Sequence, residues 1–447
     1  MASSSAEYAQ VVDNRTRRRA AQASIIGTVL EYYDFSLYAA AAATVFGAVF
    51  FAGASPAVAT LQAVATFAVG FLVRPIAGTI LGGLGDRYGR KRILLFTMVL
   101  MGVATSLIAV VPTREQIGWL APVLLIVLRL LQGIGASAEY SGATLVAVEF
   151  AKPGQRGLLG SLPGAGSTLG AALGTLMLLL FSTVLSREQF LSWGWRVPFL
   201  LSLVLVAYAL WLRIQLPETP EYERSEGVSS RTSTPVRDTL RQHPRALICI
   251  VVAVTGQIGL SYFYTVFMAT YATNQLGFDA SQTFIGLLVA QLGSSLTFPF
   301  FGWLSDRIGR LPVMFFGFAF SAALAFPAFF LTTDGALLGY CVMVFLGNAI
   351  GSGAVFAVLG TFISEHFPPH RRFSSMGLSR ETGNAIGAAV VPLLAVALSF
   401  ESGTSSLSLL LIGLSVLGAA AIALMPKTPA GAYRAPTAVQ AEGPAAG

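Results

Sequence analysis

The stretch that decides the fold is a short charged segment between two long apolar ones: Gly82-Gly83-Leu84-Gly85-Asp86-Arg87-Tyr88-Gly89-Arg90-Lys91-Arg92. A similar segment follows about 220 residues later: Gly302-Trp303-Leu304-Ser305-Asp306-Arg307-Ile308-Gly309-Arg310. A second pattern, Glu-x-x-x-Pro-x-x-Arg, begins at Glu149 and again at Glu365. Two repeats at nearly the same offset predict a chain of two structurally similar halves.

The composition indicates an integral membrane protein. Hydrophobic residues make up 55% of the 447 residues and charged residues only 11%, whereas soluble domains carry roughly a quarter charged residues. An apolar run of about 20 residues can cross a hydrocarbon core roughly 30 Å thick. We therefore predict an all-α polytopic membrane protein with twelve transmembrane helices in two pseudo-symmetric six-helix bundles. The predicted spans lie near residues 24–48, 57–81, 93–111, 118–142, 158–184, 194–216, 246–274, 281–304, 311–331, 336–364, 374–399 and 404–425.

These spans divide the chain into five segments. The first apolar run is too long and too charged for a cleaved secretory signal, so we expect it to be retained. The central loop reads as a flexible tether, and the Ala/Pro-rich C-terminus is predicted to be disordered. The segments are an N-terminal tail (1–23), an N-terminal bundle (24–216), the central loop (217–245), a C-terminal bundle (246–425) and a C-terminal tail (426–447).

The net charge of +7 reflects membrane topology rather than nucleic-acid binding. Of the 28 Lys and Arg residues, only Arg114 and Arg187 fall in loops on the face opposite the termini. Cytoplasmic loops are the ones enriched in Lys and Arg. We therefore predict a multi-pass protein of the bacterial inner (plasma) membrane with both termini in the cytoplasm, in contact with lipid and present as a monomer.

The sequence offers no sign of a metal site, a cofactor or an enzyme. Its two cysteines, Cys249 and Cys341, both fall within apolar runs, which excludes a disulfide framework. All three histidines lie in segments predicted to be cytoplasmic, and we find no arrangement of a nucleophile with a base.

The first span carries two carboxylates, Glu31 and Asp34, three residues apart and hence on one helical face. Charged side chains at membrane depth are costly and usually line a polar pathway. A carboxyl there can take up and release a proton reversibly, so we predict a role in proton coupling. The alternative is a structural pair bonded to neighbouring helices.

The fourth span carries a polar stripe at helical spacing: Arg129, Gln132, Ala136, Glu139 and Tyr140. We predict that this stripe faces a water-filled cavity. Arg129 is expected to bind a substrate carboxylate, Gln132 and Tyr140 are further predicted substrate contacts, and Glu139 is a third proton-coupling candidate. The alternative is an ion pair within the protein that fixes helix packing.

Further candidates for substrate contact lie elsewhere. Arg380 in span eleven is either a substrate contact or part of an internal salt bridge with Glu381, and Arg74 either faces the cavity or reaches the cytoplasmic surface. The remaining predicted substrate contacts are Arg196, Tyr262, Tyr264 and Asn348. For the last three, structural hydrogen bonds are an equal alternative.

These motifs resemble those of the major facilitator superfamily over essentially the whole chain. The loops at 82–92 and 302–310 are similar to its motif after helices two and eight, and Arg129-x-x-Gln132-Gly133 is similar to its helix-four motif. Within the superfamily the chain resembles metabolite:proton symporters, which include shikimate, α-ketoglutarate, citrate and proline/betaine permeases. That likeness is carried by Leu30-Glu31-Tyr32-Tyr33-Asp34-Phe35, Gly70-Phe71-Leu72-Val73-Arg74-Pro75, Glu139-Tyr140, Ser192-Trp193-Gly194-Trp195-Arg196-Val197-Pro198 and Leu216-Pro217-Glu218-Thr219-Pro220.

The sequence departs from the family pattern at three places. Ser137 and Ala138 stand where two glycines are common, Leu311 stands where a basic residue is usual, and the pair Arg380-Glu381 is not part of the subfamily pattern.

The resemblance implies transport by alternating access, in which two bundles rock about a central site. It also implies a cytoplasmic gate built from the repeated loops. We assign to this gate Gly82, Asp86, Arg87, Gly89, Arg90, Glu149, Asp306, Arg307 and Arg310.

The expected function is proton-coupled uptake of a small organic acid such as shikimate or a di- or tricarboxylate, because several arginines could contact an anion. The alternative substrate is a zwitterion such as betaine or proline. A third alternative is a membrane sensor that does not transport.

Overall fold

The chain folds into helices alone in the part that the structure describes. The computed structural model describes residues 14–53, 55–218, 241–278, 280–332, 336–401 and 403–426, and no strand occurs in these ranges. The all-α fold class is therefore confirmed. Most of the predicted N-terminal tail (1–13), most of the central loop (219–240) and nearly all of the predicted C-terminal tail (427–447) lie outside the described residues.

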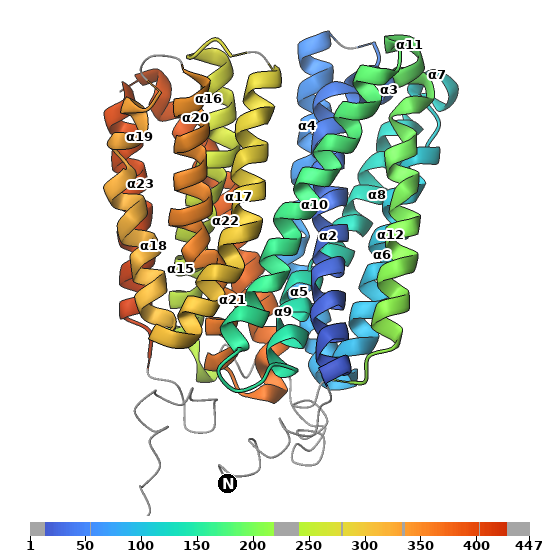
Figure 1. Cartoon of the computed structure of the whole chain (residues 1–447). Coiled ribbons are helices and arrows are strands. Elements are labelled where there is room, and N and C mark those ends of the chain that lie inside the picture. The colour runs from blue at the N-terminus through green and yellow to red at the C-terminus, as the bar shows by residue number, and fades with distance from the viewer. Residues whose placement is uncertain are drawn as a thin grey trace, which may run out of the picture.

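The two halves of the chain form two groups of helices that stand side by side (Figure 1). The first group comprises α2 (Asn14–Thr44), α3 (Phe46–Phe50), α4 (Pro56–Leu72), α5 (Arg74–Tyr88), α6 (Arg90–Val110), α7 (Arg114–Ile117), α8 (Leu120–Ala136), α9 (Glu139–Glu149), α10 (Arg156–Val184), α11 (Arg187–Gln189), η1 (Phe190–Gly194) and α12 (Arg196–Ile214). The second comprises α15 (Pro244–Tyr262), η2 (Phe263–Phe267), α16 (Met268–Asn274), α17 (Ala280–Ile308), α18 (Arg310–Leu324), α19 (Pro327–Phe330), α20 (Leu337–Val344), η3 (Phe345–Ser352), α21 (Gly353–His366), η4 (Pro369–Arg371), α22 (Arg372–Glu401) and α23 (Gly403–Ala423).

Every predicted span falls on helix. Within the described residues, ten helical stretches are long and apolar enough to cross a membrane, and each overlaps one predicted span. The other two predicted spans fall on α2, and on α18 together with α19. The helix α2 has 31 residues and starts ten residues before the predicted span, because the arginine-rich segment before it continues the helix.

Two of these ten stretches are interrupted, one next to a proline and one at a turn. Between α4 and α5, Pro75 lacks the backbone N–H that a continuous helix needs, so a new helix starts at Arg74. Between α8 and α9 the chain turns at Ser137 and Ala138. These breaks place Arg74 and Glu139 each at the first residue of a helix.

The halves meet along two seams lined by glycines, α5 against α22 and α10 against α17. At Gly377 an added β-carbon would lie 2.5 Å from the carbonyl oxygen of Gly78, and at Gly82 it would lie 2.8 Å from the Cα of Ser374. At Gly302 it would collide with Ser161 and the backbone of Gly157. Only glycine allows backbones to approach this closely, as in packed membrane helices.

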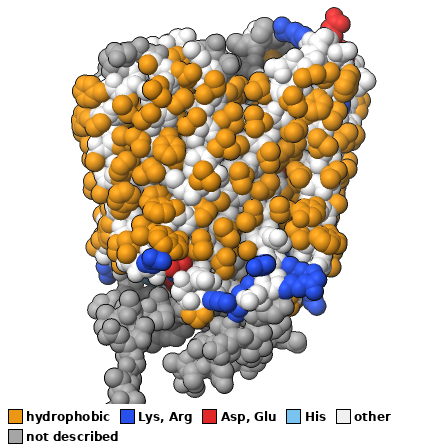
Figure 2. All heavy atoms as spheres, viewed as in Figure 1, with side chains coloured by type: hydrophobic (Ala, Val, Ile, Leu, Met, Phe, Trp, Pro, Cys, Tyr) orange, Lys and Arg blue, Asp and Glu red, His pale blue; other side chains and the backbone are white. Residues whose placement is uncertain are grey.

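The outer surface fits a bilayer. Hydrophobic side chains cover most of the face shown in Figure 2, and Lys and Arg side chains gather near its lower edge. The same lower end of Figure 1 carries α9 and the ends of α21 and α5.

Candidate functional site

A cluster of four buried charged side chains lies where the two halves meet. Arg74 donates from Nη2 to Glu31 Oε1 of α2 at 2.7 Å and from Nε to Glu381 Oε2 of α22 at 2.8 Å. All three side chains are at most 3% exposed. The break after α8 leaves the Ala136 carbonyl free to accept a further bond from Arg74 at 3.3 Å. Arg74 therefore joins both halves, so the alternative that it reaches the cytoplasmic surface is wrong.

Arg380 completes this central cluster. Its Nη1 donates to Glu381 Oε1 at 2.6 Å, so the alternative of an internal salt bridge holds. Its guanidinium carbon lies 3.7 Å from the centre of the Tyr140 ring in the first half. Each oxygen of the Glu381 carboxylate thus faces its own guanidinium, one from each half.

Asp34 lies in a different, neutral environment. It is fully buried, and its two oxygens accept hydrogen bonds at 2.6 Å from Thr105 Oγ1 of α6 and Ser202 Oγ of α12. Among the described residues it forms no ion pair. Glu31 and Asp34, predicted to act on one face, therefore have separate partners in α5 and in α6 and α12.

Arg129 is linked to Asp34 through two neutral side chains. Gln132 Nε2 donates to Thr105 Oγ1 at 2.8 Å, while Gln132 Oε1 accepts from Arg129 Nη1. Thr105 in turn bonds Asp34. These hydrogen bonds connect the Arg129 guanidinium to the Asp34 carboxyl without direct contact between them.

Aromatic rings surround Arg129. Its guanidinium carbon lies 4.6, 4.2 and 4.7 Å from the ring centres of Phe35, Tyr38 and Phe67. Arg129 is fully buried and forms no ion pair in the described part of the chain. Cation–π attraction partly replaces the missing counter-ion.

Glu139 pairs with a residue that sequence reasoning did not single out. Its Oε2 accepts from Arg213 Nη1 near the end of α12 at 2.7 Å, and both side chains are buried. Its other oxygen finds no hydrogen-bond partner among the described residues and lies against the α2 backbone at Gly27. The predicted single stripe is therefore wrong, because the break at Ser137 and Ala138 turns Glu139 toward α12 and away from Arg129.

The second half contributes neutral polar groups. Ser261 Oγ donates to Asn348 Oδ1 at 2.8 Å, and Asn348 Nδ2 donates to Ser294 Oγ at 3.1 Å. Asn348 lies in the π-helical segment η3, and such segments are frequent at functional sites. Within the part of the chain that the structure describes, the hydroxyl of buried Tyr264 has no hydrogen-bond partner. Tyr262 is partly buried and lies close enough to the central cluster to interact with its charges.

Arg196 lies apart from these groups. Its Nη1 donates to the carbonyl oxygens of Ala109 and, at 3.0 Å, Val111, at the end of α6. Its guanidinium lies over the Trp195 ring. Arg196 thus satisfies carbonyl groups that every helix C-terminus leaves open.

The first repeated loop closes the lower end of the molecule. Asp86 accepts backbone N–H bonds from Phe373 at 3.2 Å and Ser374 at 2.8 Å, at the start of α22. A carboxylate at a helix N-terminus is stabilised by the helix dipole. Beside it, Glu149 pairs with Arg90 and, at 3.1 Å, with Arg372.

The second repeated loop makes the matching contact in the other direction. Asp306 of α17 accepts backbone N–H bonds from Gly157 and Leu158 at the start of α10, both at 2.8 Å. Arg310 pairs with Asp306 at 2.7 Å and with Glu365 at 3.0 Å. An aspartate of each half therefore caps a helix of the other half.

The other predicted gate residues play different parts. Gly82 lets α5 press against α22, and Gly89, with φ of 105°, makes the turn between α5 and α6. Arg87 and Arg307 are exposed and lie over Tyr88 and Trp303.

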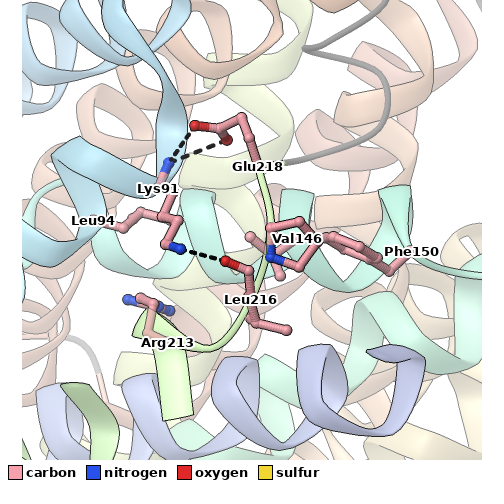
Figure 3. Close-up of a pocket in the computed structure, with 8 residues that line it drawn as sticks. Lys91, Leu94, Val146, Phe150, Arg213, Leu216 and Glu218 are labelled. Atoms are coloured by element: carbon pink, nitrogen blue, oxygen red, sulfur yellow. Dashed lines mark hydrogen bonds between the residues drawn. The ribbon is translucent and has the colours of Figure 1, made fainter. Parts of the chain in front are cut away.

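A small cleft lies beside this closed end, lined by residues of α6, α9 and the start of the central loop (Figure 3). Within it the Lys91 amide donates to both oxygens of Glu218 at 3.2 Å, and the Lys91 ammonium donates to the carbonyl oxygens of Ile214 and Leu216. These contacts fasten the start of the central loop to α6.

Sequence reasoning did not single out Arg213 or Arg372, and it named Glu381 as a partner of Arg380 but not of Arg74. Each is a charged residue within or next to an apolar span, so the rule that drew attention to Glu31 could have found them. In the described ranges no group of three His, Cys, Asp or Glu residues could hold a metal ion.

Comparison with known families and proteins agrees with this architecture. A model described as Major Facilitator Superfamily matches residues 24–392 and 274–446. The "Shikimate transporter" of Escherichia coli is 40% identical over 386 residues, covering 85% of this chain and 87% of that protein. The "Proline/betaine transporter" of Salmonella typhimurium is 33% identical over 375 residues, covering 82% and 75%.

Solved structures share the fold. The proton:xylose symporter XylE superposes with a TM-score of 0.73 at 16% sequence identity, covering 92% of this chain and 95% of that one. The similar proteins are transporters and not enzymes, in agreement with the expectation from sequence.

Proposed function

The chain belongs to the Major Facilitator Superfamily, and on this premise we propose that it is a proton-coupled symporter that imports a small organic acid by alternating access. The similarity to a shikimate transporter favours a hydroxylated carboxylic acid. The proposed location is the bacterial inner membrane, as a monomer with both termini and the central loop in the cytoplasm.

One observation carries the assignment of an acid. Arg74 and Arg380, one from each half, converge on a single carboxylate at the interface between the halves. Two guanidiniums around one carboxylate make a strong and geometrically specific anion site. A binding site at the interface of two repeats is also what alternating access requires.

Proton coupling is assigned first to Asp34, with Glu31 and Glu139 as the other candidates. Asp34 is supported because it is buried among neutral hydroxyl groups, so a proton can neutralise it without breaking an ion pair. Glu31 and Glu139 each face an arginine. Arg129 is connected to Asp34 only through Gln132 and Thr105. We therefore assign to Arg129 a response to the protonation of Asp34 rather than direct contact with the substrate.

The remaining contacts of the substrate are assigned to neutral groups. Tyr140 and Tyr262 lie beside the central cluster, and Asn348 with its serine partners offers hydrogen bonds for hydroxyl groups. Arg196 and Tyr264 are left out of the proposed site, because the first caps a helix and the second is packed under Gly347.

The repeated loops are assigned as the cytoplasmic gate. Because Asp86 and Asp306 each cap a helix across the interface, their contacts would have to break for the lower end to open. The structure then corresponds to a state closed toward the cytoplasm.

A zwitterion such as betaine or proline is the second candidate substrate. It is favoured by the similarity to a proline/betaine transporter and by the tyrosines around the central cluster, since aromatic rings bind quaternary ammonium groups. A zwitterion also presents a carboxylate to the two arginines.

The test is uptake by purified protein in liposomes with an imposed inward proton gradient, using shikimate, α-ketoglutarate, citrate, proline and betaine. We expect gradient-dependent accumulation of an acid, lost in Arg380→Ala and retained in the control Arg187→Ala, which lies in the outer loop. Accumulation of only betaine or proline would replace the acid by the zwitterion. Transport of none of them by folded, inserted protein would reopen the sensor alternative.

A further inference from the structure

We propose that Glu381 occupies, in the substrate-free protein, the place that a substrate carboxylate takes, and that it receives the symported proton when the substrate displaces it. This inference rests on the proposed proton-coupled uptake but assigns the symported proton to Glu381 in place of Asp34. In this proposal the salt bridges of Glu381 with Arg74 and Arg380 couple substrate binding to proton uptake.

The geometry of Glu381 is that of a bound carboxylate ligand. Its Oε1 accepts from Arg380 Nη1 at 2.6 Å and its Oε2 accepts from Arg74 Nε at 2.8 Å. The side chain is 1% exposed and lies at the seam between α5 and α22, where its Cγ would be 3.2 Å from a β-carbon added at Gly78. A carboxylate of a substrate that reached the two arginines would need the same two donor positions.

Charge balance connects this displacement to a proton. The central cluster holds two anions, Glu31 and Glu381, and two cations, Arg74 and Arg380, and is neutral as a whole. Entry of a substrate carboxylate adds one negative charge and leaves Glu381 without its guanidinium partners. An isolated ionised carboxylate in an apolar interior is so costly that it takes up a proton instead. One proton added with one carboxylate restores neutrality.

The step is a simple proton transfer. A proton from the water that enters with the substrate binds one oxygen of the displaced Glu381, giving a neutral carboxyl. When the substrate leaves on the other side, the proton returns to water and the carboxylate returns to Arg74 and Arg380. The other titratable groups facing this site are Glu31, Tyr32, Tyr140 and Tyr262.

The same displacement would loosen the interface between the halves. The contact between Arg74 and Glu381 joins α5 of the first half to α22 of the second. A substrate that takes Arg74 away from Glu381 replaces a bond within the protein by one to a ligand that can leave. Binding and the opening of the α5–α22 seam are thereby linked.

The first experiment measures protons taken up when shikimate binds to purified protein in weakly buffered solution. We expect about one proton per shikimate in the wild type. Glu381→Gln, which keeps the shape but cannot ionise, should bind shikimate with no proton uptake and with an affinity that no longer falls as pH rises. Proton uptake that persists in Glu381→Gln but is lost in Asp34→Asn would overturn the inference and leave the proposed function standing.

The second experiment does not depend on the substrate. Glu381→Ala leaves both guanidiniums without their carboxylate and makes room for a small one, so acetate should raise its melting temperature while the neutral isostere acetamide should not. The wild type should show no such difference. If no acid binds the wild type but acetate stabilises Glu381→Ala, the proposed substrate class fails and the assignment of Glu381 stands. If acetate and acetamide act alike on Glu381→Ala, the assignment of Glu381 is refuted.

Discussion

At the scale of single residues, the buried charges fall into two kinds of environment. Arg74, Arg380, Glu31 and Glu381 neutralise one another directly, whereas Asp34 and Arg129 are held apart by Gln132 and Thr105. A directly paired charge is held in one protonation state for as long as its partner stays in contact. A charge held by neutral groups is free to change its state, which is what a proton carrier needs.

If Asp34 rather than Glu381 carries the proton, Asp34→Asn uncouples transport while leaving the substrate site intact. With one proton per substrate, a pH difference of one unit supplies ~1.4 kcal/mol and supports roughly tenfold accumulation. The variant should equilibrate substrate across the membrane with almost no accumulation. Uptake in liposomes with and without the gradient measures this, and wild-type accumulation by Asp34→Asn would reject the assignment.

We expect the buried ion pair of Glu139 and Arg213 to contribute mainly to the free energy of unfolding. Glu139→Gln leaves Arg213 buried without its counter-ion, which costs about 3–5 kcal/mol in comparable pairs. Replacing both residues by Met should recover most of that loss, because apolar replacement of a whole pair is often neutral. Thermal unfolding in detergent provides the measurement. A Glu139→Gln variant as stable as the wild type but uncoupled would instead favour the proton-coupling role.

At the scale of helices, the two gate aspartates act on a neighbour in the other half. Asp86 caps α22 and Asp306 caps α10 through two backbone N–H groups each. Hydrogen bonds to a charged group contribute roughly 1.5–3 kcal/mol, enough to hold one conformation over another at least tenfold.

We expect Asp86→Asn to abolish net uptake while the protein stays in the membrane, and Asp306→Asn to impair uptake in the same direction. An amide oxygen can accept one bond but brings no negative charge to the helix terminus, so the closed state is weakened. Uptake assays on membranes with equal amounts of each variant decide this. Normal uptake by Asp86→Asn would remove the residue from the gate.

Helix breaks mark the limit of what the sequence could predict. The apolar runs located the spans, and the repeated loops located the segments that join the two halves at the lower end, because both depend on local composition. The partners of the charges depend on how broken helices pack. The turn at Ser137 and Ala138 redirected Glu139 to α12, and Pro75 placed Arg74 where it reaches α22. No periodicity within one span could reveal that Glu381, some 300 residues away, completes the site of Arg74.

At the scale of the whole molecule, the two seams should open together. Each half packs as a unit, and α5–α22 and α10–α17 both lie at the interface. A change that forces one seam apart must therefore move the other, since packed helices shift as bodies rather than bend continuously.

We expect Gly302→Leu to expose the far seam as well as its own. A side chain at this position collides with Ser161 and the Gly157 backbone, which wedges α17 away from α10. Hydrogen exchange should rise at the Gly157 amide and also at the Phe373 and Ser374 amides in the other seam. Faster exchange confined to Gly157 would show that the seams open independently.

The hydrogen bonds between Glu218 and the start of α6 bear on whether the two halves need to be one polypeptide. The first residues of the central loop belong physically to the first half, while seams and ion pairs hold that half to the second. Covalent continuity beyond Glu218 is then dispensable for assembly. Two polypeptides divided after that residue and produced in the same cell should bind each other and purify as one complex. A division before Lys91, which takes the anchor of Glu218 out of the first polypeptide, should not give such a complex.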